Sequence, residues 1–151
     1  MMNSSEIEVM KLNASTDKEA LKYMGDYLVN LQLVTTNFPE KVIEREGKLP
    51  TGLPVKPFGV AIPHTCPEYV FQSKLLIGAL KHPVVFRQMG DSHEQVDVSF
   101  VFMPAILESG RHLTLLEKLF NSLQDDQFID ALTNWDGKKS TLTRLVRSGV
   151  K

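Results

Sequence analysis

The spacing of apolar residues predicts helices towards both ends of the chain and strands between them. The clearest strand pattern is at Val96–Phe102, where apolar side chains alternate with Asp97 and Ser99. A polar loop is predicted at 89–93, and the residues 81–83 are predicted to separate two neighbouring strands. The other strands are predicted at residues 6–9, 59–62, 74–80 and 84–86.

Capping signals and apolar positions at helical spacing predict the first two helices. Thr16 followed by Glu19 is a capping box, which predicts a helix start. One face of this helix carries Leu21, Met24, Leu28 and Leu31. Pro39 suits the first turn of a second, short helix that directs Val42 and Ile43 inward, and Gly47 is the expected C-terminal cap.

Three more helices are predicted in the last third of the chain. After Ser109–His112, apolar residues at spacings of three, four and three predict a helix whose buried stripe is Leu113, Leu116, Phe120 and Leu123. Asp125–Asp126 open the next helix, with Ile129 and Leu132 inside, and the last helix is expected from Ser140 to Arg147. We therefore predict one α/β domain over residues 1–151, a mixed sheet flanked by helices on both faces.

Composition narrows the classes of function. The 151 residues include 17 basic and 18 acidic side chains, so there is no electrostatic footprint for nucleic acid and no polybasic membrane patch. A single cysteine is typical of a reducing compartment. The N-terminus lacks the pattern of a signal peptide, and the longest apolar run, 100–107, is shorter than a bilayer span of roughly 20 residues. We expect a cytoplasmic protein that does not insert into a membrane.

His64 is the first candidate for chemistry. The short apolar strand before it stops at Pro63, because proline cannot donate to a sheet ladder. A histidine at the end of such a strand can be presented to a partner, and its unperturbed pKa makes it a versatile group near neutral pH. A lone histidine in this position also fits a purely structural role, and the pattern leaves both interpretations open.

His112 and Arg45 are the other candidates. His112 falls in the first turn of its helix, where the positive helix end disfavours imidazolium and favours a bound anion; it would otherwise cap the helix at the surface. Arg45 offers a planar fork for phosphate oxygens. Flanked by Glu44 and Glu46, it would otherwise be a solvated charge in weak local ion pairs.

Taken together, these segments resemble a known family. The matching residues are Arg45-Glu46, Pro50-Thr51-Gly52, Gly59–His64, and His112-Leu113 with Leu115-Leu116. They resemble the mannitol/fructose-type enzyme IIA domain of the phosphoenolpyruvate-dependent sugar phosphotransferase system, and galactitol-type members most closely. The resemblance covers nearly the whole chain, and its specific part is the Ala-Ile-Pro-His element.

The resemblance implies a phosphohistidine relay. His64 matches the histidine that accepts phosphate through Nε2 from the histidine phosphocarrier protein. It then passes the group to a cysteine of a IIB subunit, which serves a membrane IIC subunit and a sugar alcohol such as galactitol. Arg45 matches the phosphate-stabilising arginine and His112 the second histidine, and the relay needs no cofactor or metal.

Two other functions stay open beside the relay. The chain could be a regulatory, nitrogen-type relative that signals by its phosphorylation state. It could also be a non-catalytic module that binds a metal through His64, Cys66 and His82, although the spacing of these residues is a weak signal. We expect Cys66 to be a small packing residue, and His82 and His93 to lie at the surface.

Overall fold

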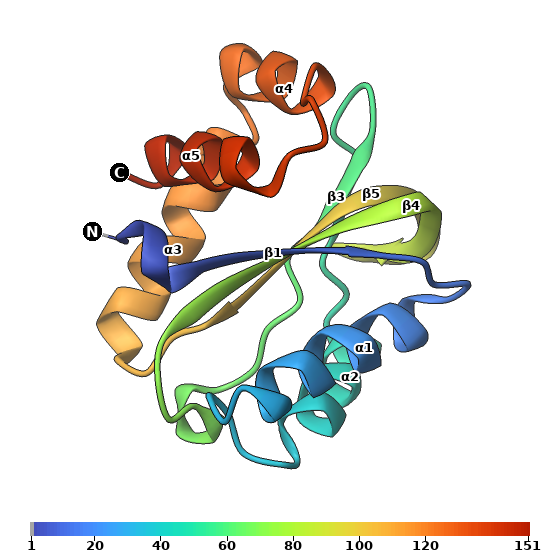
Figure 1. The fold of residues 1–151 in the computed structure, drawn as a ribbon. Coiled ribbons are helices and arrows are strands. Elements are labelled where there is room, and N and C mark those ends of the chain that lie inside the picture. The colour runs from blue at the N-terminus through green and yellow to red at the C-terminus, as the bar shows by residue number, and fades with distance from the viewer. Residues whose placement is uncertain (1) are drawn as a thin grey trace.

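The computed structural model describes residues 2–151, and within this range five strands form one mixed sheet with helices on both faces (Figure 1). This is the α/β architecture predicted from the sequence. The strands are β1 (Ile7–Leu12), β2 (Gly52–Leu53), β3 (Gly59–Ala61), β4 (Lys74–Gln88) and β5 (Asp91–Ala105). The α-helices are α1 (Asp17–Asn30), α2 (Phe38–Lys48), α3 (Ser109–Ser122), α4 (Asp126–Thr133) and α5 (Lys139–Gly149). Short 3-10 turns lie at η1 (Ser4–Glu6) and η2 (Pro67–Tyr69).

The long strands β4 and β5 form the centre of the sheet. They pair antiparallel along most of their length, and β4 also pairs parallel with β1. On the other side, β5 pairs parallel with β3, and β3 pairs antiparallel with β2. Gly52 of β2 pairs in turn with Gln88 at the end of β4. A Cβ atom on Gly52 would lie 2.5 Å from the Arg87 carbonyl oxygen, so this close approach requires glycine.

The prediction that residues 81–83 separate two strands is wrong. β4 is continuous, and its pairing with β5 shifts register between Ala79 and Val84. Pro83 is exposed within this irregular stretch, where a strand tolerates a residue that cannot donate a ladder hydrogen bond. The predicted 89–93 loop is also shorter than expected: Gln88 pairs with Asp91, so Met89 and Gly90 alone form the hairpin tip. Gly90 has a φ of 80°, which favours glycine in such a turn.

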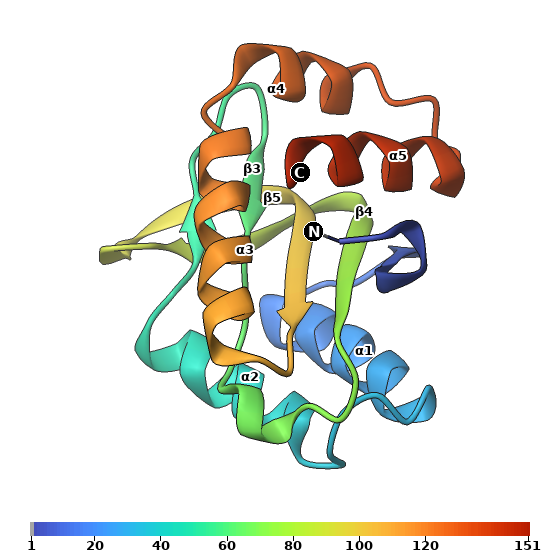
Figure 2. The ribbon, with the colours of Figure 1, turned by 90° about the vertical axis from the view of Figure 1, so that its left-hand side faces the viewer.

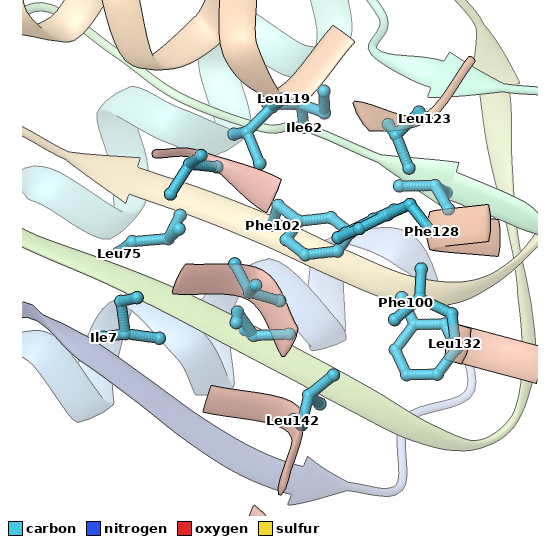
Figure 3. Close-up of a cluster of buried hydrophobic side chains, with 14 of the residues drawn as sticks. Ile7, Ile62, Leu75, Phe100, Phe102, Leu119, Leu123, Phe128, Leu132 and Leu142 are labelled. Atoms are coloured by element: carbon cyan, nitrogen blue, oxygen red, sulfur yellow. The ribbon is translucent and has the colours of Figure 1, made fainter. Parts of the chain in front are cut away.

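Two layers of buried side chains lie on opposite faces of the sheet. One layer packs α1 and α2 against the sheet and includes Met24, Phe38 and Phe86. The other packs α3, α4 and α5 against the opposite face, where Phe102, Leu119 and other side chains point towards one another (Figure 3). Seen from the side, α3 passes beside β5 and α5 lies near the N-terminus (Figure 2). The sheet is thus packed on both faces, and the loops at its ends can carry functional groups.

The observed helix ends refine the predicted ones. The Thr16 side chain accepts from the Glu19 backbone N–H, as predicted, while the Glu19 carboxylate accepts from Ser15 N rather than from Thr16 N. Leu31 lies beyond the end of α1 and is exposed, so it is not part of the buried face. Gly47 is not a cap, because α2 continues to Lys48 and Leu49 is its C-cap.

Two further boundaries differ from the predicted ones. The first strand begins at Ile7 and not at Glu6, because Ser4–Glu6 form the turn η1. Of the predicted stripe of α3, Leu123 is buried and Leu116 and Phe120 pack partly buried against the core. Leu113, however, is 59% exposed, and Leu115 and Leu119 are buried instead. Residues two apart on a helix lie about 200° apart around its axis, so Leu113 and Leu115 cannot face the same core. The exposed side of α3 therefore carries a large apolar residue beside His112.

Candidate functional site

His64 lies just after β3, at the end of a buried segment that leads out of the sheet. Its Nδ1 lies 2.8 Å from the backbone oxygen of Ile62. A carbonyl oxygen can only accept a hydrogen bond, so Nδ1 carries the proton and Nε2 keeps its lone pair. The ring is half-buried. The local backbone therefore selects one tautomer of His64 and leaves its Nε2 free to react.

The ring of His112, at the start of α3, contacts the ring of His64. It closes the first turn of α3, where its backbone N–H donates to the Glu108 carbonyl at 2.9 Å. The ring centroids of His64 and His112 are 5.5 Å apart, in an edge-to-face arrangement of 61°. The structure thus brings together two of the three candidate residues, although neither their spacing nor their local patterns required it.

Arg45, the third candidate, projects from α2 into the same region. Together with His64 it lines a pocket of about 390 Å³, whose other walls include Thr51 and the hairpin tip Met89–Gly90. Its positive charge lowers the pKa of both His64 and His112, because a nearby cation disfavours imidazolium. Arg45, His64 and His112 therefore form one site.

Two buried polar atoms of this site lack a hydrogen-bond partner among residues 2–151: Arg45 Nε and His112 Nδ1. A buried polar group without a partner is costly, and such groups concentrate where a ligand will supply the missing bond. Both belong to side chains that can donate to the oxygens of an anion. The site is accordingly incomplete in a way that fits a phosphate-like group.

Both histidines are neutral at neutral pH. Burial lowers the pKa of His64, and the Arg45 charge lowers it further, against the opposing effect of the hydrogen bond to Ile62. Burial, followed by the neighbouring His64 and Arg45, lowers the pKa of His112 to about 4. The sequence predicted a neutral His112 from its helix position, but burial is the largest cause. Neutral imidazoles beside a guanidinium suit nucleophilic attack on an anionic group.

Cys66 is exposed, so the prediction that it is a packing residue is wrong. The chain has already left the sheet at this point, and the side chain borders a surface pocket with Lys41 and Tyr69. His82 and His93 lie at the surface, as predicted. Within residues 2–151, no group of three or more His, Cys, Asp or Glu side chains is placed to hold a metal ion. His64, Cys66 and His82 consequently do not form the cluster that a metal-binding module would need.

Glu46 and Thr51 are parts of the site that the sequence did not single out as functional. Both are buried, and the Glu46 carboxylate accepts hydrogen bonds from the Thr51 backbone N–H and hydroxyl, each at 2.8 Å. Two signals pointed to Glu46: its place beside Arg45 in a matched segment, and its position four residues after Val42, on the buried face of α2.

Exposed apolar side chains flank the site. Leu49 is 57% exposed and lines the same pocket as His64, and Leu113 is 59% exposed next to His112. Exposed apolar residues that gather beside polar chemistry are typical of a protein-docking surface. No helix in the described range 2–151 is long and apolar enough to span a bilayer.

Comparison with known sequences adds the family context. The model of the EIIA 2 family of the phosphoenolpyruvate-dependent sugar phosphotransferase system matches residues 1–147. The galactitol-specific EIIA component of Escherichia coli is 28% identical over 114 residues, which are 76% of this chain and 75% of the relative. The mannitol-specific EIICBA component of Vibrio cholerae is 26% identical over 140 residues, 91% of this chain but only 20% of that longer protein.

Solved structures show the same fold at low sequence identity. The mannitol IIA crystal structure from Escherichia coli has a TM-score of 0.72 at 21% identity, covering 97% of this chain and 99% of that one. The complex of mannitol IIA with phosphorylated IIB from Escherichia coli gives 0.74 at 20% identity, with 98% of both chains covered. The nitrogen regulatory protein IIA-Ntr of Neisseria meningitidis gives 0.67 at 20% identity, with 99% and 95% covered.

Proposed function

Because the chain belongs to the EIIA 2 family of the phosphoenolpyruvate-dependent sugar phosphotransferase system, we propose that it carries a phosphoryl group on His64. The observation that supports this most directly is the 2.8 Å hydrogen bond between His64 Nδ1 and the Ile62 carbonyl, which leaves Nε2 unprotonated. Residues 1–151 then act as one enzyme IIA domain. Its place is the cytoplasm, where phosphoenolpyruvate is available.

In the first half of the cycle, the Nε2 lone pair attacks the phosphorus of a phosphohistidine on the histidine phosphocarrier protein. The new Nε2–P bond forms as the donor's N–P bond breaks, and the electron pair of that bond stays on the donor imidazole. Arg45 and His112 donate to the oxygens that carry the charge during transfer, using the polar atoms that have no partner among residues 2–151 in the resting protein. No metal or cofactor takes part in this step.

In the second half, a cysteine thiolate of a IIB subunit attacks the phosphorus. The S–P bond forms, the Nε2–P bond breaks, and its electron pair returns to Nε2. The structure of mannitol IIA with phosphorylated IIB supports a partner of this class, since it shares the fold of this chain. Leu49 and Leu113 flank the two histidines and offer apolar contacts to successive partners.

The sugar is proposed to be a sugar alcohol. A galactitol-specific and a mannitol-specific component are both recognisably related to this chain, at 28% and 26% identity. We favour galactitol, with a membrane IIC subunit completing the transfer. The regulatory alternative, supported by the shared fold of IIA-Ntr, uses the same His64 chemistry and differs in the acceptor.

Intact-mass spectrometry tests the proposal. The protein is incubated with phosphoenolpyruvate, enzyme I and the histidine phosphocarrier protein, and a galactitol-type IIB subunit is then added. We expect one acid-labile phosphoryl group, which His64→Gln abolishes and which moves to IIB. The exposed His93 provides the matched control, His93→Gln, which should be phosphorylated like the wild type.

Two results would change this conclusion. A phosphoryl group that persists in His64→Gln would refute His64 as the carrier. A phosphoryl group that His64 accepts but no sugar-type IIB subunit removes would favour the regulatory role over sugar uptake.

A further inference from the structure

A chain of hydrogen bonds runs behind His64, from the backbone of Ile62 through Thr51 to the buried carboxylate of Glu46. We propose that Glu46 is a positioning residue that acts through Thr51 and Ile62 to hold His64 in the tautomer with a free Nε2. This inference rests on the proposed role of His64 as the phosphoryl carrier. It assigns a function to Glu46 and Thr51, which the relay chemistry itself does not use.

The contacts join α2 to the end of β3. Glu46 Oε2 accepts from the Thr51 backbone N–H at 2.8 Å, and Oε1 accepts from the Thr51 hydroxyl at 2.8 Å. The same hydroxyl oxygen accepts from the Ile62 backbone N–H at 3.2 Å. Glu46 is only 7% exposed and Thr51 only 3%, so water does not compete effectively for these bonds.

The direction of each bond is determined by its chemistry. An ionised carboxylate can only accept, so the hydrogen of the Thr51 hydroxyl must point to Glu46. The lone pairs of that hydroxyl are then left to accept from Ile62 N–H. A side chain that could donate at the Glu46 position would let the Thr51 hydroxyl hydrogen turn away from it. The carboxylate therefore determines where that hydrogen points, while the backbone N–H groups of Thr51 and Ile62 can only donate.

Ile62 connects these hydrogen bonds to the imidazole of His64. Its N–H is held by Thr51 and its carbonyl accepts from His64 Nδ1 at 2.8 Å, so the backbone on both sides of one residue is bonded. The next residue is Pro63, whose ring restricts its own backbone rotation. Little freedom remains for the Ile62 carbonyl to turn away, and the Nδ1–H tautomer is held as a result.

Burial at the position of Glu46 disfavours the ionised form of a carboxylate. Burial raises its pKa, Asp17 raises it further, and the Thr51 hydrogen bonds and Arg45 oppose this shift. Lys18 and Arg87 line a pocket of about 350 Å³ that Glu46 also borders. An apolar side chain four residues after Val42 would extend the buried face of α2 without that cost. The structure shows one role that a carboxylate at this position performs and an apolar side chain would not: it orients the Thr51 hydroxyl.

The test measures the tautomer of His64 in the unphosphorylated protein, by long-range ¹H–¹⁵N correlation spectra of the imidazole nitrogens. In the wild type at neutral pH we expect a protonated Nδ1 and an unprotonated Nε2. Glu46→Gln keeps the shape of the side chain but presents an amide donor to Thr51. We expect this variant to show a mixture of both His64 tautomers and a rate of phosphoryl acceptance reduced roughly 10- to 100-fold, the range for losing a group that orients a reactive ligand.

Matched variants separate positioning from a general loss of structure. Glu44→Gln makes the same chemical change on the exposed side of α2 and should leave the tautomer and the rate unchanged. Thr51→Val removes the linking hydroxyl and should reproduce the effect of Glu46→Gln, while Thr51→Ser restores the hydroxyl and should rescue it. If Glu46→Gln does not fold, the Thr51 pair decides the test.

The outcome is independent of whether His64 carries phosphate. A folded Glu46→Gln or Thr51→Val protein that keeps the wild-type Nδ1–H tautomer would overturn the positioning role, even if transfer slowed. A tautomer that shifts in Glu46→Gln, in combination with a wild-type protein that accepts no phosphoryl group, would instead support the positioning role and refute the proposed carrier function.

Discussion

His64, at the end of β3, and His112, in the first turn of α3, face each other across 5.5 Å, yet their polar surroundings differ. The Nδ1 atom of His64 is bonded to a carbonyl, and buried hydrogen bonds hold that stretch of backbone. The Nδ1 atom of His112 is buried and has no partner within residues 2–151. The protein thus determines the tautomer of His64 in advance and leaves the tautomer of His112 undetermined.

Two identical side chains can therefore take separate roles in one site. The protonation of His64 is settled before any ligand arrives, which suits a nucleophile. His112 can adopt whichever tautomer an incoming group requires, which suits a hydrogen-bonding partner. Arg45 acts electrostatically on both rings, so it belongs to neither role alone.

Among variants of the three site residues other than His64, we expect the largest loss of activity from Arg45→Met. Loss of the guanidinium removes stabilisation of the transferring group, and we expect phosphoryl acceptance to fall roughly 10²- to 10³-fold. The pKa of both histidines should rise, because a nearby positive charge no longer disfavours imidazolium. Single-turnover transfer and an NMR titration measure the two effects.

Arg45→Lys provides the control for charge. It keeps a cation but loses the planar fork, so its histidine pKa values should stay closer to those of the wild type while its transfer rate falls between the other two proteins. Equal transfer rates for the wild type and Arg45→Met would show that Arg45 does not take part in the reaction.

A smaller effect is expected from His112→Gln. The variant loses one hydrogen bond to the charged transferring group, which is worth about 1.5–3 kcal/mol, so acceptance should slow by roughly 10- to 150-fold. The measurement is the single-turnover rate from the phosphorylated carrier protein, with His93→Gln as the unaffected control. A loss as complete as that expected for His64→Gln would break the comparison, because His112 would then be as essential as the nucleophile.

A further effect concerns stability and its dependence on pH. The pKa of His112 is about 4 in the folded protein, below the ordinary value of 6.5, so the unfolded chain binds more protons between these values. The free energy of unfolding should therefore decrease as the pH falls from 6.5 towards 4. Urea unfolding at several pH values should show a shallower decrease in His112→Gln, and an unchanged slope would mean that His112 is not buried as a neutral ring.

The α/β architecture and the three candidate residues could be predicted from the sequence, because periodicity and the Ala-Ile-Pro-His element are local signals. Their convergence could not, since His112 reaches His64 only after α3 packs on the sheet. Leu113 illustrates the limit: the stripe that begins at Leu113 and the one that contains Leu115 and Leu119 both have helical spacing. Whether Leu113 or Leu115 faces the core depends on how the helix is rotated against the sheet.

Long-range pairing explains the other differences. Lys81–Pro83 carries turn-like residues, but the neighbouring β5 continues past it and keeps both halves of β4 in one strand. The sequence did not reveal the role of Glu46, because its partner Thr51, and the Ile62 N–H that donates to Thr51, meet it only through folding. A buried carboxylate among apolar positions is recognised as functional once its hydrogen bonds are known.

The tip of the β4–β5 hairpin has a consequence for how such a protein can diverge. Met89 and Gly90 turn the chain, and together with Asp91 and Ser92 they form one wall of the His64 pocket. The buried residues of both strands lie elsewhere along the hairpin. Mutations or insertions at this tip alter what meets the reactive ring while leaving the core intact. Recognition can therefore change at Met89, Asp91 and Ser92 with little effect on the core, whereas Gly90 is constrained by its φ of 80°.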